Sequence, residues 1–257
     1  MARFSQYITL PASASRREFP GNTLTEYTVR LAERLDLHDR PYEVALCSIK
    51  YPNSWYNVTE GRISLKDTKV KGKDGVTPQH VIYPIDLHRG RVTSVSDLLQ
   101  RMHKAATSMK LVKQFSIFHE PYDNVATLMV QGRGWEVRLS DDLANIFGFE
   151  AGRWYTKGSY RAGRGVDISA GHRLMYVYSD IAENRPVGDV QVPLLRVVAF
   201  AGDRNEDHSV DFTRPQYVRA ARKSTDLFKV QLATDTGKPI AFSDGNVSVT
   251  LHLREAS

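Results

Sequence analysis

The sequence predicts a mainly-β protein, a β-sandwich or jelly roll, into which a small α+β unit is inserted. Short apolar stretches with period-two alternation recur along the chain, and turns built from Gly, Pro, Asn and Asp separate them. Helical periodicity is found at two places in the middle of the chain. The 257 residues are enough for one large β domain or two modest ones, and 41% of them are hydrophobic, as is ordinary for a soluble globular protein.

The two most apolar stretches are 174–178 and 190–200, and a polar turn built on Pro186 and Gly188 separates them. Both stretches are rich in β-branched and aromatic residues, which is typical of strands covered on both faces. Pro193 interrupts the second stretch near its start, where a missing N–H is tolerated only at an edge or a bulge. We expect these two strands to be central in the fold, with the remaining chain supplying a second sheet.

Further strands are predicted on both sides of this pair. In chain order they lie at 4–11, 24–37, 42–49, 228–232, 240–242 and 247–254. Pro52 must end or bend the strand that begins at Tyr42, because it has no backbone N–H to donate. The last strand has a clean period of two, with Val247, Val249 and Leu251 on one face, which indicates an amphipathic strand with one buried side.

A helix is predicted at 94–107. Ser94 is placed to cap it, Asp97 is its third residue, and the apolar residues that follow obey the i, i+3, i+4, i+7 rule. A hairpin is predicted next, at 114–131, because two alternating arms flank a turn that contains Pro121. A helix followed by a hairpin differs from the strands before it, so the chain changes character in this region.

A second, shorter helix is predicted at 140–147. Two aspartates occupy its first turn, where negative charge suits the helix dipole, and Gly148 is placed as the residue that ends it. Together these elements predict an α+β insertion at 76–150. The jelly-roll or sandwich domain would then consist of residues 1–75 and 151–257.

Composition limits where the protein is made and what it contacts. Its formal net charge of +6 favours polyanions only mildly, because Lys and Arg are spread along the chain. No apolar run reaches the roughly 18 residues that a membrane helix needs. The first residues lack the apolar core of a secretory signal, so we expect synthesis in the cytoplasm or nucleus without secretion. The single cysteine, Cys47, is interpreted as a buried small hydrophobic residue.

The sequence displays no catalytic or metal-binding constellation. The eight histidines lack the spacing of a zinc site, and phosphate-binding loops, dinucleotide fingerprints and nucleophile elbows do not occur. We therefore predict no catalytic residues, no metal and no cofactor. An enzyme on a jelly-roll scaffold, such as a cupin, would need His and carboxylate groups that converge from distant strands.

A basic loop between residues 150 and 170 mixes cations with aromatic rings. The cations are Arg153, Lys157, Arg161 and Arg164, and the rings are those of Trp154, Tyr155 and Tyr160. This mixture suits phosphate contact and base stacking, so the four cations are candidate polyanion contacts. The alternative is an exposed loop whose aromatic residues anchor it to the sheet or to a neighbouring subunit.

Several stretches, in a fixed order, resemble one family. They are Phe19–Thr23, Tyr42–Leu46 with Tyr51–Val58, Leu139–Phe149, Tyr176–Ile181 with Val187–Asp189 and Pro193–Arg196, and Gly237–Phe242 with Leu251–Arg254. Together they are similar to the minor capsid, or penton, proteins of Maverick/Polinton elements and the related adintoviruses and virophages. The sequence departs from the family pattern at Tyr42, Ser179 and Leu253, and segments 60–80 and 150–170 carry no family signal.

The resemblance implies a single jelly-roll β-sandwich with an insertion. It implies homopentamers at the vertices of an icosahedral virion, among major capsid proteins of the double-jelly-roll type, and a host receptor as a further partner. Candidate subunit contacts are Tyr51, Trp55 and Tyr56, with Trp154, Tyr155 and Tyr160 of the basic loop. Burial of Trp55 within its own domain is the alternative.

Two other classes of function compete with a capsid protein. A receptor- or carbohydrate-binding sandwich would expose a shallow aromatic patch, and a monomer would favour it over a penton. A nucleic-acid-binding module would use Arg153 to Arg164, and its affinity for DNA would fall as salt rises.

Overall fold

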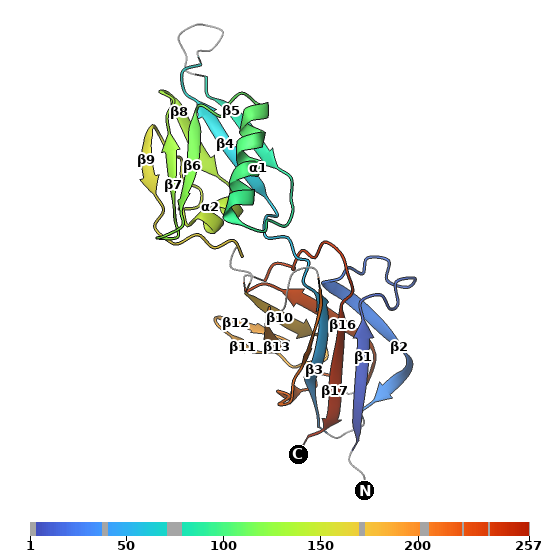
Figure 1. Cartoon of the computed structure of the whole chain (residues 1–257). Coiled ribbons are helices and arrows are strands. Elements are labelled where there is room, and N and C mark those ends of the chain that lie inside the picture. The colour runs from blue at the N-terminus through green and yellow to red at the C-terminus, as the bar shows by residue number, and fades with distance from the viewer. Residues whose placement is uncertain are drawn as a thin grey trace. The chain divides into compact units, whose positions relative to one another are not determined.

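The structure is a computed structural model that describes residues 4–37, 41–70, 79–169, 173–200, 206–222, 224–235 and 237–256. The chain forms two compact units (Figure 1). The first, here called the sandwich unit, consists of Met1–Trp55 and His172–Ser257, and the second, the inserted unit, is Tyr56–Gly171. Among the described residues, no helix is long and apolar enough to span a membrane.

The sandwich unit contains two antiparallel sheets within the described ranges. One has the order β1 (Ser5–Pro11), β17 (Ser248–Glu255), β3 (Tyr42–Pro52) and β14 (Asp207–Asp211), with β15 (Val218–Arg219) also paired to β3. The other has the order β13 (Leu194–Ala199), β10 (Leu174–Ser179), β16 (Ser224–Ala233) and β2 (Glu26–Asp36). A small hairpin, β11 (Arg185–Val187) and β12 (Val190–Val192), lies between β10 and β13 in the chain.

The connections between these strands are those of a jelly roll. The chain passes from one sheet to the other at nearly every step, and β1, the first strand, pairs with β17, the last. A five-stranded and a four-stranded layer joined in this way form a double Greek key. The predicted fold class, a mainly-β jelly-roll sandwich, is confirmed.

Strand register places the two ends of the chain at one end of the sandwich unit. Ser5 pairs with Arg254, and Glu255 pairs with Tyr42. At the other end of the unit, the Tyr51 hydroxyl donates to the carbonyl of Ala199, whose pairing partner is Leu174. The chain therefore leaves β3 and returns to β10 at the end opposite its termini.

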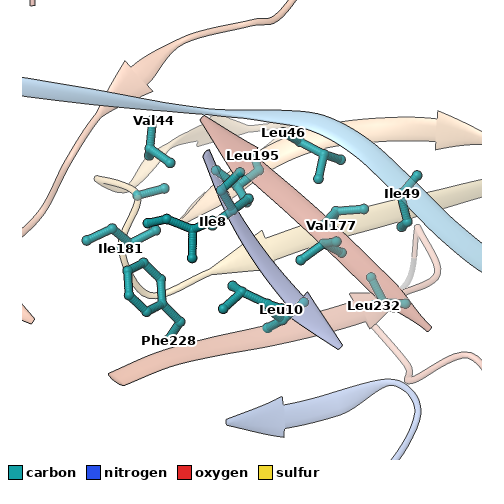
Figure 2. Close-up of a cluster of buried hydrophobic side chains, with 14 of the residues drawn as sticks. Ile8, Leu10, Val44, Leu46, Ile49, Val177, Ile181, Leu195, Phe228 and Leu232 are labelled. Atoms are coloured by element: carbon teal, nitrogen blue, oxygen red, sulfur yellow. The ribbon is translucent and has the colours of Figure 1, made fainter. Parts of the chain in front are cut away.

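The core of the sandwich unit is formed by side chains that the two sheets direct toward each other (Figure 2). Those labelled in the figure are Ile8, Leu10, Val44, Leu46, Ile49, Val177, Ile181, Leu195, Phe228 and Leu232, all of them buried. At about 25 cal/mol for each Å² of apolar surface buried, this cluster is the main source of the unit's stability.

The two most apolar stretches, 174–178 and 190–200, are buried less than the sequence predicts. In β10 the burial alternates, because Met175 and Val177 face the core while Tyr176 and Tyr178 lie half-buried on the outer face with their rings stacked. β10 is internal to its sheet, but β13 is an edge strand, so the expectation of two doubly covered central strands is wrong. The break at Pro193 is confirmed, since β12 ends before it and β13 begins after it.

The inserted unit has two three-stranded sheets among its described residues. One has the order β5 (Val81–Leu87), β4 (Gly61–Asp67) and β8 (Trp135–Leu139), and the other β6 (Phe115–Glu120), β7 (Val125–Val130) and β9 (Gly158–Arg161). The helices are α1 (Val95–Ser108) and α2 (Asp141–Phe147). A second core, which includes Ile63, Leu65, Leu98 and Phe147, lies entirely inside this unit.

The expected limits of the insertion, 76–150, are wrong at both ends. β4 is the central strand between β5 and β8, and β9 pairs with β7, so both strands belong to the inserted unit. The unit consequently extends from Tyr56 to Gly171. The alternation of Ile63 and Leu65 with polar residues in the short stretch Arg62–Leu65 is typical of a strand, but such a pattern does not say which sheet the strand joins.

The structure agrees with the predicted helix ends more closely than with the predicted limits of the insertion. The Ser94 side chain accepts a hydrogen bond from the Asp97 backbone N–H, and Gly148 ends α2 with a φ of 78°. Ser140 precedes α2 without a side-chain cap, because its hydroxyl oxygen accepts from the backbone N–H of Arg62 and its hydroxyl donates to the carbonyl of Glu60. The Asp142 carboxylate in the first turn accepts from the backbone N–H groups of residues 59 and 60.

Candidate functional site

The aromatic residues proposed as subunit contacts near the end of β3 fall into different environments. Tyr51 is fully buried and packs edge-on against Phe200, so its expected role as a subunit contact is wrong. Trp55 is half-buried and stacks on the same ring, with centroids 4.2 Å apart, which is the alternative considered for it. Tyr56 belongs to the inserted unit, where it is half-buried beneath the guanidinium of Arg89.

The aromatic residues of the basic loop also lie in different environments. Tyr155 is part of the core of the inserted unit and is only 3% exposed, so its side chain offers almost no surface to a neighbouring subunit. Its backbone forms a bridge with Val137, which holds this part of the loop against β8. Trp154 is half-buried with the cations of Lys66 and Arg138 above its ring.

Three of the four predicted polyanion contacts surround one cavity. Arg153, Arg161 and Arg164 line a space of about 680 Å³ together with Asn145, Gly148, Phe149, Glu150, Ala151, Tyr155, Ser159, Tyr160 and Gly163. This cavity is called the arginine pocket below. Lys157, the fourth predicted contact, is exposed and does not line it.

Each arginine of the pocket has a protein partner. Arg153 pairs with Glu150 at 3.1 Å and Arg161 with Asp123 at 2.7 Å, and Arg164 donates to the Asn145 amide oxygen at 3.4 Å. The guanidinium of Arg153 also lies 5.1 Å from the centroid of the Tyr155 ring, within the range of cation–π attraction. The ion pairs are exposed to solvent, so they fix the side chains only weakly.

Backbone contacts fix the frame of the pocket more firmly. The Arg164 carbonyl lies against Gly148, where an added Cβ would be only 2.2 Å from its oxygen. Next to it, the Asp167 N–H donates to the carbonyl of Ile146 and the Val166 N–H to that of Asn124, both at 2.8 Å. The end of α2 and the turn between β6 and β7 therefore hold the arginine-bearing loop in place.

Some residues of the pocket could not be found from sequence. Asn145 lies on α2 and Ser159 on β9, and neither stands out in the basic loop or near it. They reach the pocket because β9 pairs with β7 and because the chain reverses at Gly148. Only the cationic and aromatic composition of 153–164 was a usable signal.

A second cluster of polar groups lies on the sandwich unit, and sequence reasoning missed it. The His252 ring is within 2.7 Å of the Ser5 hydroxyl through Nε2 and of the Tyr217 hydroxyl through Nδ1. Tyr7 stacks on it with centroids 4.4 Å apart. Burial and the charge of Arg254 lower the pKa of His252, whereas burial raises the pKa of Tyr217.

Among the described residues, no three His, Cys, Asp or Glu side chains are grouped in a way that could hold a metal ion. Cys47 is half-buried rather than buried, and desolvation raises the pKa of its thiol. A thiol with a raised pKa carries little thiolate at neutral pH, so it is a weak nucleophile.

Comparison with solved structures finds similarity over the whole chain. The crystal structure of the mavirus penton protein aligns with a TM-score of 0.45 and 9% identity, covering 100% of both chains. A chain in the cryo-EM structure of the Sputnik virophage aligns with a TM-score of 0.46 and 8% identity, covering 98% of both chains. No family model matches the chain, and no curated protein matches it.

Proposed function

We propose that the chain is a structural capsid protein of the penton type, of which five copies occupy each vertex of an icosahedral virion. The observation that carries the proposal is the jelly-roll connection of the sandwich unit, interrupted once between β3 and β10 by the inserted unit. Jelly rolls of this kind form viral capsid, lectin and cupin domains, and the family resemblance of the sequence selects the first of these. The proposed role is structural, with no catalytic step.

The proposed location is the capsid vertex, and the proposed partners are other copies of the chain and a major capsid protein of the double-jelly-roll type. Both follow from the family resemblance. A host receptor is a further proposed partner. The sandwich unit, as the jelly-roll part of the chain, would build the vertex. Its termini lie at one end, and the chain leaves for the inserted unit at the other.

A ring of identical copies needs two different patches on each copy. β1 and β13 are edge strands of different sheets. On one side of the sandwich the Tyr27 hydroxyl of β2 reaches the carbonyl of Leu10, and on the other the Arg196 guanidinium of β13 covers the ring of Phe212. The two edge strands therefore lie on opposite sides of the unit.

Apolar side chains are exposed on or near both edges. Tyr7 on β1 is 66% exposed, and on the other side Val197 of β13 is 37% and Val190 of β12 is 51% exposed. Packing one edge of a copy against the opposite edge of the next would cover these side chains and leave no free end in a closed ring. We assign the subunit contacts to these residues, in place of Tyr51 and Tyr155.

The mass of the full chain in solution, measured by light scattering after size exclusion, tests this proposal. One copy has a mass of 29.0 kDa, so a ring of five is expected at about 145 kDa. Charge at the contact, in the double variant Val190→Glu and Val197→Glu, is expected to give monomers with an unchanged circular dichroism spectrum. Ile82→Glu on the inserted unit, where the native side chain is 52% exposed, is the matched control and is expected to keep the ring. A chain that remains a monomer at every concentration contradicts the proposal.

A further inference from the structure

We propose that the arginine pocket of the inserted unit binds an acidic sugar, one that carries a carboxylate or a sulfate group and is presented on a glycan. Arg153, Arg161 and Arg164, from before, at the end of and after β9, line one cavity together with neutral polar residues. This binding goes beyond the role proposed in the capsid and does not depend on the assembly of a ring.

The charges of the lining select an anion. Three arginines line the cavity, and Glu150 is the single carboxylate residue among the lining residues. Its ion pair with Arg153, like that of Arg161 with Asp123, is solvent-exposed, and such pairs contribute little to stability. An incoming anion can therefore replace these carboxylates as a partner. Guanidinium groups suit this because their planar N–H donors match the geometry of a carboxylate or sulfate.

The size and the polar lining select a sugar. A cavity of about 680 Å³ lies within the range of small-molecule sites. Asn145, Ser159 and Tyr160 also line the pocket, and the amide and the two hydroxyls can each donate and accept hydrogen bonds. A ring with several hydroxyl groups and one acid group would use both kinds of lining residue, whereas a simple oxyanion would use only the cations.

The same geometry argues against a nucleic-acid strand. Single-stranded nucleic acid needs cations in a row along its backbone and open aromatic faces on which bases can stack. Lys157 does not line the pocket, Tyr155 is buried, and the Arg153 guanidinium lies over the rings of both Tyr155 and Tyr160. The cations are therefore gathered around one point instead of spaced along a track.

The pocket is preformed, which lowers the cost of binding. The backbone just after Arg164 is hydrogen-bonded to the end of α2 and to the turn between β6 and β7, and the Arg164 carbonyl lies against Gly148. The Arg153 guanidinium lies over the rings of Tyr155 and Tyr160, which pack edge-on with centroids 5.0 Å apart. Groups already placed in this way lose less conformational entropy when a ligand binds.

The experiment measures binding of four probes to the full chain by calorimetry at about 0.15 M salt. The probes are sialyllactose, which carries a carboxylate, lactose 3′-sulfate, which carries a sulfate and no carboxylate, neutral lactose and a thymidine oligonucleotide. We expect at least one acidic sugar to bind and lactose not to bind, and the comparison of the first two probes identifies the acid group. Arg164→Gln and Arg153→Gln are each expected to weaken binding about tenfold or more, because each removes a charged hydrogen bond.

Lys157→Gln is the matched control, since it removes a cation from the same loop outside the pocket. It is expected to change the affinity by less than about twofold, as for a screened surface charge. Equal weakening by Lys157→Gln and the pocket variants would overturn the proposal in favour of a diffuse basic surface. Tighter binding of the oligonucleotide than of either acidic sugar would overturn it in favour of nucleic acid, and binding of neither acidic sugar above lactose would overturn it outright. Thermal melting of each variant verifies that it is folded, and the solution mass shows separately whether the ring forms.

Discussion

His252 illustrates how one side chain on the sandwich unit depends on its neighbours. Its ring contacts hydroxyl groups on both nitrogens and the face of Tyr7, and the Arg254 guanidinium, 3.4 Å from the centroid of the Tyr217 ring, adds positive charge nearby. Glu43 pairs with Arg254 and partly balances that charge. Burial and the charge of Arg254 both disfavour the protonated imidazole, so the pKa of His252 is lowered from its ordinary value of 6.5.

A lowered pKa in the folded state makes stability depend on pH. When the pH falls below 6.5, the unfolded chain takes up the proton on His252 more readily than the folded chain. The free energy of unfolding should therefore decrease as the pH falls from 6.5 through the lower pKa of the folded state, and remain constant in this respect at higher pH. Urea unfolding between about pH 5 and pH 8 measures the decrease.

The variant His252→Gln isolates this contribution, because glutamine keeps a polar side chain that does not titrate. The difference in unfolding free energy between the native chain and the variant should shrink as the pH falls. His103→Gln, at an exposed position on α1, is the matched control and should leave the pH dependence unchanged. A constant difference for His252→Gln across the pH range would refute the assignment.

At the scale of residues, the sequence shows which chemical groups a loop carries better than it shows where those groups lie in the fold. The cationic composition of the loop is read directly from the sequence, but the arrangement of Arg153, Arg161 and Arg164 around one pocket depends on pairing between β7 and β9, which no local pattern encodes. Tyr155 was expected at a contact surface and is instead in the core, because an aromatic residue in a polar loop suits either place.

At the scale of elements, local rules succeed where local interactions decide. The end of α2 is predictable because glycine adopts a positive φ at little cost, and Gly148 has a φ of 78°. Strand burial is less predictable, since β10 has an apolar composition on both faces but only one of them is covered. Its tyrosines occupy the outer face, where their rings are half-buried and their hydroxyl groups can reach water.

Gly148→Ala is predicted to destabilise the inserted unit by more than the strain of a positive φ alone. That strain costs about 1–2 kcal/mol for a residue with a Cβ, and the new Cβ would also lie 2.2 Å from the Arg164 carbonyl oxygen. Gly152→Ala is the matched control, because Gly152 has a φ of 75° and open space around its Cα. Urea unfolding of both variants separates the two costs, and an equal loss of stability would show that the close approach of Arg164 costs nothing.

At the scale of the whole molecule, each unit has its own core, and the sequence did not reveal where one unit ends. The alternating stretch Arg62–Leu65 looks like any other strand of the chain, and residues 158–161 show no alternation at all. Only the pairing of β4 with β5 and β8, and of β9 with β7, assigns these residues to the inserted unit. The jelly-roll order of the sandwich unit was likewise beyond the reach of periodicity, which gives the faces of strands but not their neighbours. It was reached through family resemblance instead.

The division into two cores predicts that Tyr56–Gly171 folds when it is expressed by itself. All the buried hydrophobic residues of its core come from within this segment, and the fragment is well above the length of roughly 40 residues below which domains need disulfides or metals. Circular dichroism and urea unfolding should show one cooperative transition. The shorter fragment 76–150 is the matched control and should remain unfolded, because it lacks β4, the strand that joins β5 to β8, and β9, which pairs with β7. If the longer fragment lacked a cooperative transition, or the shorter one folded equally well, the inserted unit would not be an independent domain with these limits.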